Sequence, residues 1–122
     1  MTLDEVCLYV ERCLDLPQNY IRVVDGGCKQ IEKVAFCTGA GGDFSKTAIE
    51  NDCQLLITGD LKFHEAQYAK AMGLSVIDAG HYGTEKIFTR NFAQQLRDAL
   101  READEDDVEV LEAASNTNPY TL

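Results

Sequence analysis

The segment GLSVIDAGHYGTE, residues 73–85, constrains the fold of this chain more than any other. Its apolar half, residues 74–77, predicts a buried β-strand, and Gly80 predicts a turn into a helix that begins near His81. That helix carries His81 and Glu85 four residues apart, so both side chains lie on one helical face. An imidazole and a carboxylate placed in this way can bind one divalent metal ion. The alternative is that both residues only begin the helix, where the carboxylate favours the helix dipole.

Short apolar segments alternate along the chain with segments of helical periodicity, which predicts an α/β fold. We expect a mostly parallel sheet flanked by helices, in a single domain over residues 1–122, because no linker or repeat interrupts the chain. The continuous apolar run of the second predicted strand indicates that both of its faces are covered. The predicted strands are residues 21–24, 34–37, 55–57 and 74–77, and the predicted helices are residues 3–14, 44–51, 61–71 and a long one from 81 to the acidic run at 102–107.

Both ends of the chain carry local signals. Thr2 and Glu5 have the spacing of a capping box, which predicts the start of a helix. Residues 108–111 favour a last strand, and residues 115–122 favour a polar tail. The first residues, MTLDEV, are acidic where a signal peptide would be basic, so we expect no secretory leader.

Composition argues against several kinds of partner. The formal charge of −10 argues against direct binding of nucleic acid, because phosphate contacts need clustered lysine and arginine, and against an anionic membrane surface. No apolar run is long enough to span a bilayer. The five cysteines are odd in number and form no C-x-x-C pair, which indicates reduced thiols and a cytoplasmic location.

Three loops that contain glycine follow predicted strands, at residues 38–43, 58–60 and 78–81. In a parallel sheet these loops meet at one edge, where α/β proteins bind their ligands. Thr38, Gly39 and Gly41 are candidates for binding substrate, because the backbone amides of a glycine-rich loop can bind an anion. The alternative for this loop is a tight strand-to-helix turn. Tyr82 either lines the same pocket or packs in the interior.

Asp60 and His64 stand four residues apart at the start of another predicted helix. They could form a second ligand pair, or His64 could serve as an acid–base group or proton shuttle near neutral pH. The alternative is that His64 is a half-buried surface residue. We expect Asp60 to cap the helix in either case.

Three longer segments are more specific as a set than any of these pieces alone: VAFCTGAGG at 34–42, ITGDLKFH at 57–64 and IDAGHYGTE at 77–85. Together they resemble the Nif-three-like family, whose members are often labelled GTP cyclohydrolase type 2 homologues. The tail NTNPY at 116–120 fits as well. The resemblance covers almost the whole chain and corresponds to the C-terminal half of the family.

The resemblance implies a Nif-three-like half-domain with a site for two adjacent divalent metal ions, which could be zinc, manganese, iron or cobalt. The histidine and glutamate of the family segment G-H-x-x-x-E are metal ligands, and here they are His81 and Glu85. The family's remaining ligands, a His-His pair and an aspartate, lie in an N-terminal lobe. This chain has no His-His pair, so we expect a missing N-terminal lobe to supply them. The resemblance also implies a cytoplasmic homo-oligomer, often a ring-like hexamer.

These features predict one lobe of a dinuclear, metal-dependent hydrolase that acts on a small, phosphate-containing substrate. In such an enzyme two close metal ions polarise a substrate oxygen and activate a bridging water. His81 and Glu85 would bind metal, and Asp60 and His64 would have catalytic roles in orienting water or substrate. The chain alone is expected to be inactive. The competing hypothesis is a non-enzymatic metal-binding scaffold or regulatory module that acts through oligomer surfaces.

Overall fold

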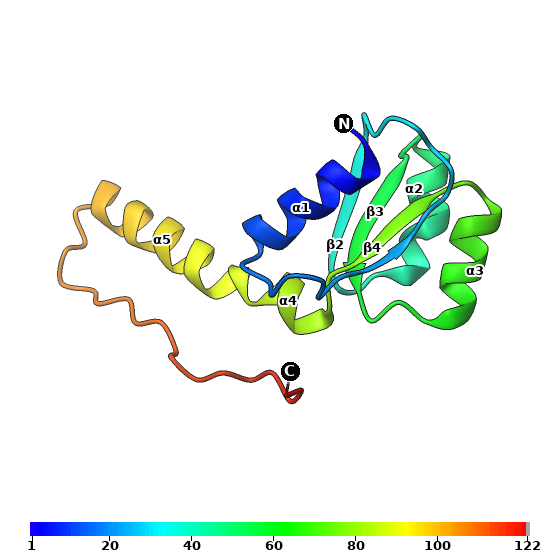
Figure 1. Ribbon diagram of the computed structural model, residues 1–122. Coiled ribbons are helices and arrows are strands. Elements are labelled where there is room, and N and C mark those ends of the chain that lie inside the picture. The colour runs from blue at the N-terminus through cyan, green and yellow to red at the C-terminus, as the bar shows by residue number, and fades with distance from the viewer. Residues whose placement is uncertain (122) are drawn as a thin grey trace. The chain divides into compact units, whose positions relative to one another are not determined.

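The computed structural model describes residues 1–121 and divides them into two compact units, residues 1–85 and residues 86–121. The first unit holds a four-stranded sheet with helices on its two sides (Figure 1). The second unit holds one long helix, α5 (Ile87–Glu102), followed by irregular chain. The elements of the first unit are α1 (Leu3–Cys13), β1 (Arg22–Val24), β2 (Val34–Ala40), the 3₁₀ helix η1 (Gly42–Phe44), α2 (Ser45–Glu50), β3 (Leu55–Gly59), α3 (Phe63–Ala71), β4 (Ser75–Asp78) and α4 (His81–Glu85).

The strands lie in the order β1-β4-β3-β2. The pairs β2–β3 and β3–β4 are parallel, whereas β1 pairs with β4 in the antiparallel sense. The prediction of an α/β fold with a mostly parallel sheet flanked by helices is therefore confirmed. Because three neighbouring strands run in one direction, the loops that follow β2, β3 and β4 emerge at the same edge.

The core lies on the two central strands, since every residue of β3 and β4 is buried. Alternate residues point to opposite faces of a strand. Leu56 and Val76 therefore share one face, where they pack with Ala48 of α2 and Ala69 of α3. Figure 1 shows α2 and α3 on this side of the sheet and α1 on the other.

Strand β2 differs from the expectation that both of its faces are covered. It pairs only with β3 among the described strands, and its side chains alternate in exposure. Val34 is 43% exposed and Phe36 is 51% exposed. The prediction was wrong because a continuous apolar run marks a strand as sheet-forming but does not say which of its faces another element covers.

Two further expectations also need correction. The long helix from residue 81 is two helices, α4 and α5, separated at Lys86. Residues 108–111 form no strand, and instead the carbonyl oxygen of Val110 accepts a hydrogen bond of 2.9 Å from Arg97. The predicted polar tail is irregular from residue 115 to residue 121, and Leu122 lies outside the described residues. The single domain over residues 1–122 stays a prediction.

The predicted capping box at the start of α1 is confirmed. The backbone N–H of Glu5 donates to Oγ1 of Thr2, and the N–H of Thr2 donates to Oε2 of Glu5, which completes the capping box. The hydrogen bond from Thr2 lowers the pKa of Glu5. All five cysteines are free thiols. Within residues 1–121, no helix has both the length and the apolar character that crossing a bilayer requires.

Candidate metal-binding site

The three loops at the carboxyl edge of the sheet are joined by short contacts. Thr58, at the end of β3, accepts a hydrogen bond of 2.8 Å from the N–H of Gly41 through its hydroxyl group. Its carbonyl oxygen accepts a hydrogen bond of 2.8 Å from Ala79. Gly59 packs so closely on the backbone of Gly80 that an added Cβ would lie 2.4 Å away. The loops therefore converge as the sequence predicts.

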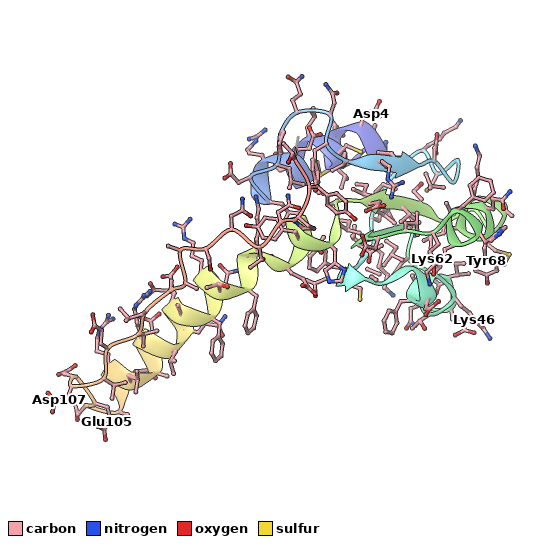
Figure 2. All side chains as sticks on the ribbon, turned by 90° about the horizontal axis from the view of Figure 1, so that it is seen from below. Asp4, Lys46, Lys62, Tyr68, Glu105 and Asp107 are labelled. Atoms are coloured by element: carbon pink, nitrogen blue, oxygen red, sulfur yellow. The ribbon has the colours of Figure 1, made fainter. Side chains whose placement is uncertain are left out.

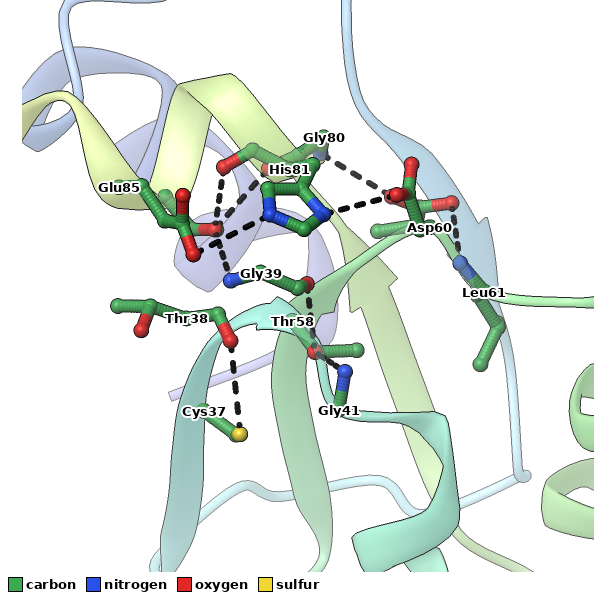
Figure 3. A network of polar contacts seen from close by, with 12 residues as sticks. Cys37, Thr38, Gly39, Gly41, Thr58, Asp60, Leu61, Gly80, His81 and Glu85 are labelled. Carbon is green, nitrogen blue, oxygen red and sulfur yellow. Dashed lines mark hydrogen bonds and ion pairs between the residues drawn. The ribbon is translucent and has the colours of Figure 1, made fainter.

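His81 and Glu85 stand at the first and last residues of α4, with their side chains facing each other (Figure 3). Nε2 of His81 lies 3.2 Å from Oε1 of Glu85. The side chains are 47% and 52% exposed, so solvent and ions can reach both. Gly80 makes this placement possible, because its φ of +77° turns the chain sharply between β4 and α4.

The other nitrogen of His81 also faces a carboxylate. Nδ1 lies 2.8 Å from Oδ2 of Asp60, which comes from the loop after β3 (Figure 3). The hydrogen bond to Asp60 raises the pKa of His81 above its ordinary value, and the charge of Glu85 acts in the same direction. The imidazole is thus held between two acidic side chains, one from its own helix and one from the neighbouring loop.

This arrangement favours a cation between Nε2 and Glu85. When Nδ1–H donates to Asp60, a neutral imidazole presents a lone pair at Nε2, and a carboxylate presents only lone pairs. The two atoms repel unless a proton or a metal ion lies between them. Two atoms bound to one cation at about 2.1 Å each lie roughly 3.0–3.4 Å apart, so the observed separation of 3.2 Å fits a shared divalent metal as well as it fits an N–H···O hydrogen bond. His81 and Glu85 are therefore suited to hold one.

The chain does not hold a complete metal centre in its described part. Within residues 1–121, no group of three or more histidine, cysteine or acidic side chains is arranged to bind a metal ion. Asp60 contacts the side of the imidazole opposite Glu85, so it supports the histidine and does not complete the ligand set. Further ligands would have to come from water or from residues outside this segment.

His64 lies apart from this pair. Its Nδ1 is 3.1 Å from Oε1 of Gln67, on its own helix, and its side chain borders a hollow of about 460 Å³. Lys46 and Tyr68 border the same hollow, on the side of the chain formed by α2 and α3 (Figure 2). The structure does not bring His64 to His81, and its catalytic role stays a prediction.

Asp60 does not cap helix α3, which corrects the expectation from its position. The N-cap residue is Lys62, whose N–H donates to Oε2 of Glu65 at 2.8 Å. Asp60 lies two residues earlier, with a positive φ of +48°, and its carboxylate turns to His81. The carboxylate of Asp60 therefore contacts His81, 21 positions away in sequence, and does not cap the neighbouring helix.

The predicted substrate-binding residues occupy different environments. Gly39 lies directly against His81 and Glu85, and Gly41 is buried against Thr58. Thr38 is exposed and Tyr82 is half-buried. Their roles in binding substrate stay predictions.

Sequence reasoning missed Thr84, which is fully buried one residue before Glu85. Its hydroxyl group accepts a hydrogen bond of 2.8 Å from the N–H of Gly39 and donates to the carbonyl oxygen of His81. It therefore ties the glycine loop to helix α4. The sequence offered one signal for Thr84, which is a small polar residue on a short helix that closely follows a buried strand.

Comparison with curated proteins finds relatives in several bacteria. The chain is 36% identical over 97 residues to a Campylobacter jejuni protein called GTP cyclohydrolase 1 type 2 homolog, covering 80% of this chain and 38% of that one. A Bacillus subtilis protein of the same name is 34% identical over 122 residues, and this match covers 100% of this chain and 32% of the Bacillus subtilis protein. The chain therefore spans about a third of the length of these relatives.

Solved structures and a family model also match this chain. Staphylococcus aureus protein SA1388 superposes on the whole chain with a TM-score of 0.88 at 25% identity, and 38% of its own length is covered. A Bacillus cereus protein related to NIF3 gives a TM-score of 0.86 at 28% identity, with 100% of this chain and 33% of that chain covered. Residues 1–119 match the model of one family. The chain belongs to the Duf34/NIF3 (NGG1p interacting factor 3) family.

Proposed function

We propose that this chain contributes His81 and Glu85 as ligands to a divalent metal centre that is completed by residues outside the chain. The observation that carries this proposal is the separation of 3.2 Å between Nε2 of His81 and Oε1 of Glu85. Asp60 occupies Nδ1, which leaves Nε2 as the nitrogen available to a metal. A carboxylate on the second nitrogen is the usual companion of a histidine that binds metal.

The proposed complete site holds two metal ions and uses a missing N-terminal lobe for the remaining ligands. Two observations support this. The described residues offer only His81 and Glu85 and no group of three or more ligands, and the chain spans about a third of the length of the relatives described above. Zinc, manganese, iron and cobalt all accept imidazole and carboxylate together. When bound, such ions would supply Lewis acidity and an activated water.

The proposed reaction is hydrolysis of a small, phosphate-containing molecule. The relatives are named GTP cyclohydrolase 1 type 2 homolog, and the pair stands at the edge of the sheet where α/β proteins bind their ligands. In this reaction His81 and Glu85 bind metal, while the loop at residues 38–43 lines the pocket beside them. We propose a cytoplasmic homo-oligomer, such as a ring-like hexamer, as the working assembly.

Metal analysis of matched variants tests the ligand assignment. In the complete protein, which supplies the remaining ligands, elemental analysis after loading with manganese, cobalt or zinc should find less bound metal in His81→Ala and Glu85→Gln than in the parent. His64→Ala is the matched control, because the other histidine of the chain lies outside the pair. Metal content that is unchanged in His81→Ala would show that the ligand assignment is wrong.

A second candidate function is a non-enzymatic metal-binding scaffold. The observation that favours it is apolar surface on the first unit, where Phe36 is 51% exposed and Phe44 is 53% exposed. Such side chains suit contacts with other protein surfaces. A panel of phosphate esters and GTP, assayed with each metal, separates the two functions. Turnover that Glu85→Gln abolishes supports the enzyme, whereas absent turnover with intact oligomers and retained metal supports the scaffold.

A further inference from the structure

We propose that Asp60 is a positioning residue, which holds the imidazole of His81 so that Nε2 points at Glu85 and is free of its proton when a metal binds. This inference rests on the proposed function, since it assigns the third member of the same site. Asp60 and His81 are 21 residues apart, and they meet only because β3 and β4 are neighbours in the sheet. The contact is 2.8 Å long, within the range of a charge-assisted hydrogen bond.

The Asp60 end of this contact is fixed by the loop that carries it. The φ of +48° places Asp60 in the left-handed region, which asparagine and aspartate tolerate better than most residues. On one side, Gly59 packs against the backbone of Gly80 and His81 with no space for a Cβ. On the other side, the N–H of Leu61 donates to Oδ2 of Asp78 at 3.2 Å. The carboxylate is therefore presented from a defined backbone position.

The His81 end is fixed by the start of helix α4. The carbonyl oxygen of His81 accepts a hydrogen bond of 2.9 Å from the buried hydroxyl of Thr84. The backbone N–H of Thr84 donates to the carbonyl oxygen of Gly80 at 3.1 Å. Since both backbones are held, the hydrogen bond between Asp60 and His81 sets the rotation of the ring.

The chemical consequence is a choice of tautomer. An ionised carboxylate can only accept, so it keeps the proton of a neutral imidazole on Nδ1 and leaves Nε2 as a lone pair. A surface ion pair would add little stability, because both side chains are about half exposed. The position of Asp60 on the nitrogen opposite Glu85 instead gives it an orienting role, as carboxylates beside metal-binding histidines have.

The substitution Asp60→Asn tests this role without disturbing the backbone, because asparagine also tolerates a positive φ. Its amide can either donate to Nδ1 or accept from it, so Nδ1–H is no longer strongly preferred, and the imidazole proton can move to Nε2, between the ring and Glu85. Long-range ¹H–¹⁵N spectra of His81 in the metal-free protein, above the pKa of the ring, should show the Nδ1–H tautomer in the parent. Asp60→Asn should shift the population toward Nε2–H, and Co²⁺ affinity measured by calorimetry should fall about 10–100-fold.

Asp52→Asn is the matched control, since Asp52 is exposed and also has a positive φ, +58°. It should leave both the tautomer and the Co²⁺ affinity unchanged. An unchanged tautomer in Asp60→Asn overturns the positioning role. The role is also overturned if His81→Ala abolishes Co²⁺ binding while Asp60→Asn leaves the Co²⁺ affinity unchanged. Co²⁺ binding that survives His81→Ala instead refutes the proposed function, and the tautomer of His81 still decides the role of Asp60.

Discussion

Gly39 lies against Glu85 with no room for a side chain between them. A Cβ added to Gly39 would stand 2.7 Å from Oε1 of Glu85 and 3.2 Å from Nε2 of His81. The backbone of Gly39 also has a φ of +68°, which L side chains rarely adopt. The absence of a side chain here leaves open the space that a shared metal ion would need.

The substitution Gly39→Ala should therefore reduce metal binding as well as stability. The added methyl group crowds both proposed ligand atoms, so we expect Co²⁺ affinity measured by calorimetry to fall about tenfold or more, as for loss of a supporting residue. The positive φ should cost about 1–2 kcal/mol in the free energy of unfolding. Gly27→Ala is the control for strain alone, because Gly27 has a φ of +88° and an added Cβ would meet nothing within 4 Å. Equal loss of Co²⁺ affinity in both variants would contradict this account.

The buried hydroxyl of Thr84 should be necessary for the stability of the loop beside the site. Thr84→Val keeps the shape of the side chain but leaves the N–H of Gly39 without its acceptor. An unpaired buried donor costs about 1–3 kcal/mol, which urea denaturation can measure. Thr47→Val, at an exposed position of α2, should change stability by less than about 0.5 kcal/mol. A similar effect at both positions would show that the hydrogen bond to Gly39 contributes nothing.

The pKa of His81 should lie above its ordinary value of 6.5 in the metal-free protein. NMR titration of the ring should show this shift, and Asp60→Asn should reduce it more than Glu85→Gln does, because the hydrogen bond to Asp60 is the largest cause. A larger effect of Glu85→Gln would contradict the proposed order of causes.

The raised pKa of His81 also has a predicted sign for stability. Since the pKa is higher in the folded chain, protonated His81 stabilises the fold below the unfolded-state pKa. This contribution is lost as the pH rises through the folded-state pKa. It should be small, because the side chain is 47% exposed.

Replacing valine by alanine should destabilise the fold more in a central strand of the sheet than in the edge strand. Val76 in β4 is completely buried, whereas Val34 in the edge strand β2 is 43% exposed. Val76→Ala should lower the free energy of unfolding by about 2 kcal/mol, from lost burial and the remaining cavity. Val34→Ala should lower it by less than about 0.5 kcal/mol. Equal costs in urea denaturation would mean that a further surface covers β2 in solution.

The fold was largely predictable because its signals are local. The apolar runs of β3 and β4 and the capping box at Thr2 each depend on neighbours in sequence. The exposure of Phe36 was not predictable, since it depends on the place of β2 at the edge of the sheet. The spacing of the apolar residues did not indicate the break between α4 and α5 at Lys86.

The candidate site divides in the same way. His81 and Glu85 were predictable as a pair, because four residues of helix bring them together. The contact between Asp60 and His81 was not, because it depends on which strands are neighbours, and the local pattern instead assigned Asp60 to the start of α3. Thr84 was missed for a similar reason, since its partner Gly39 lies 45 residues away.

The most direct test of the central claim is an anomalous diffraction map from crystals of the protein grown with Co²⁺. If the pair shares a metal ion, the map should show a peak within bonding distance, about 2.1 Å, of both Nε2 of His81 and Oε1 of Glu85. A Co²⁺ peak elsewhere, with these two atoms still facing each other and no metal between them, would contradict it.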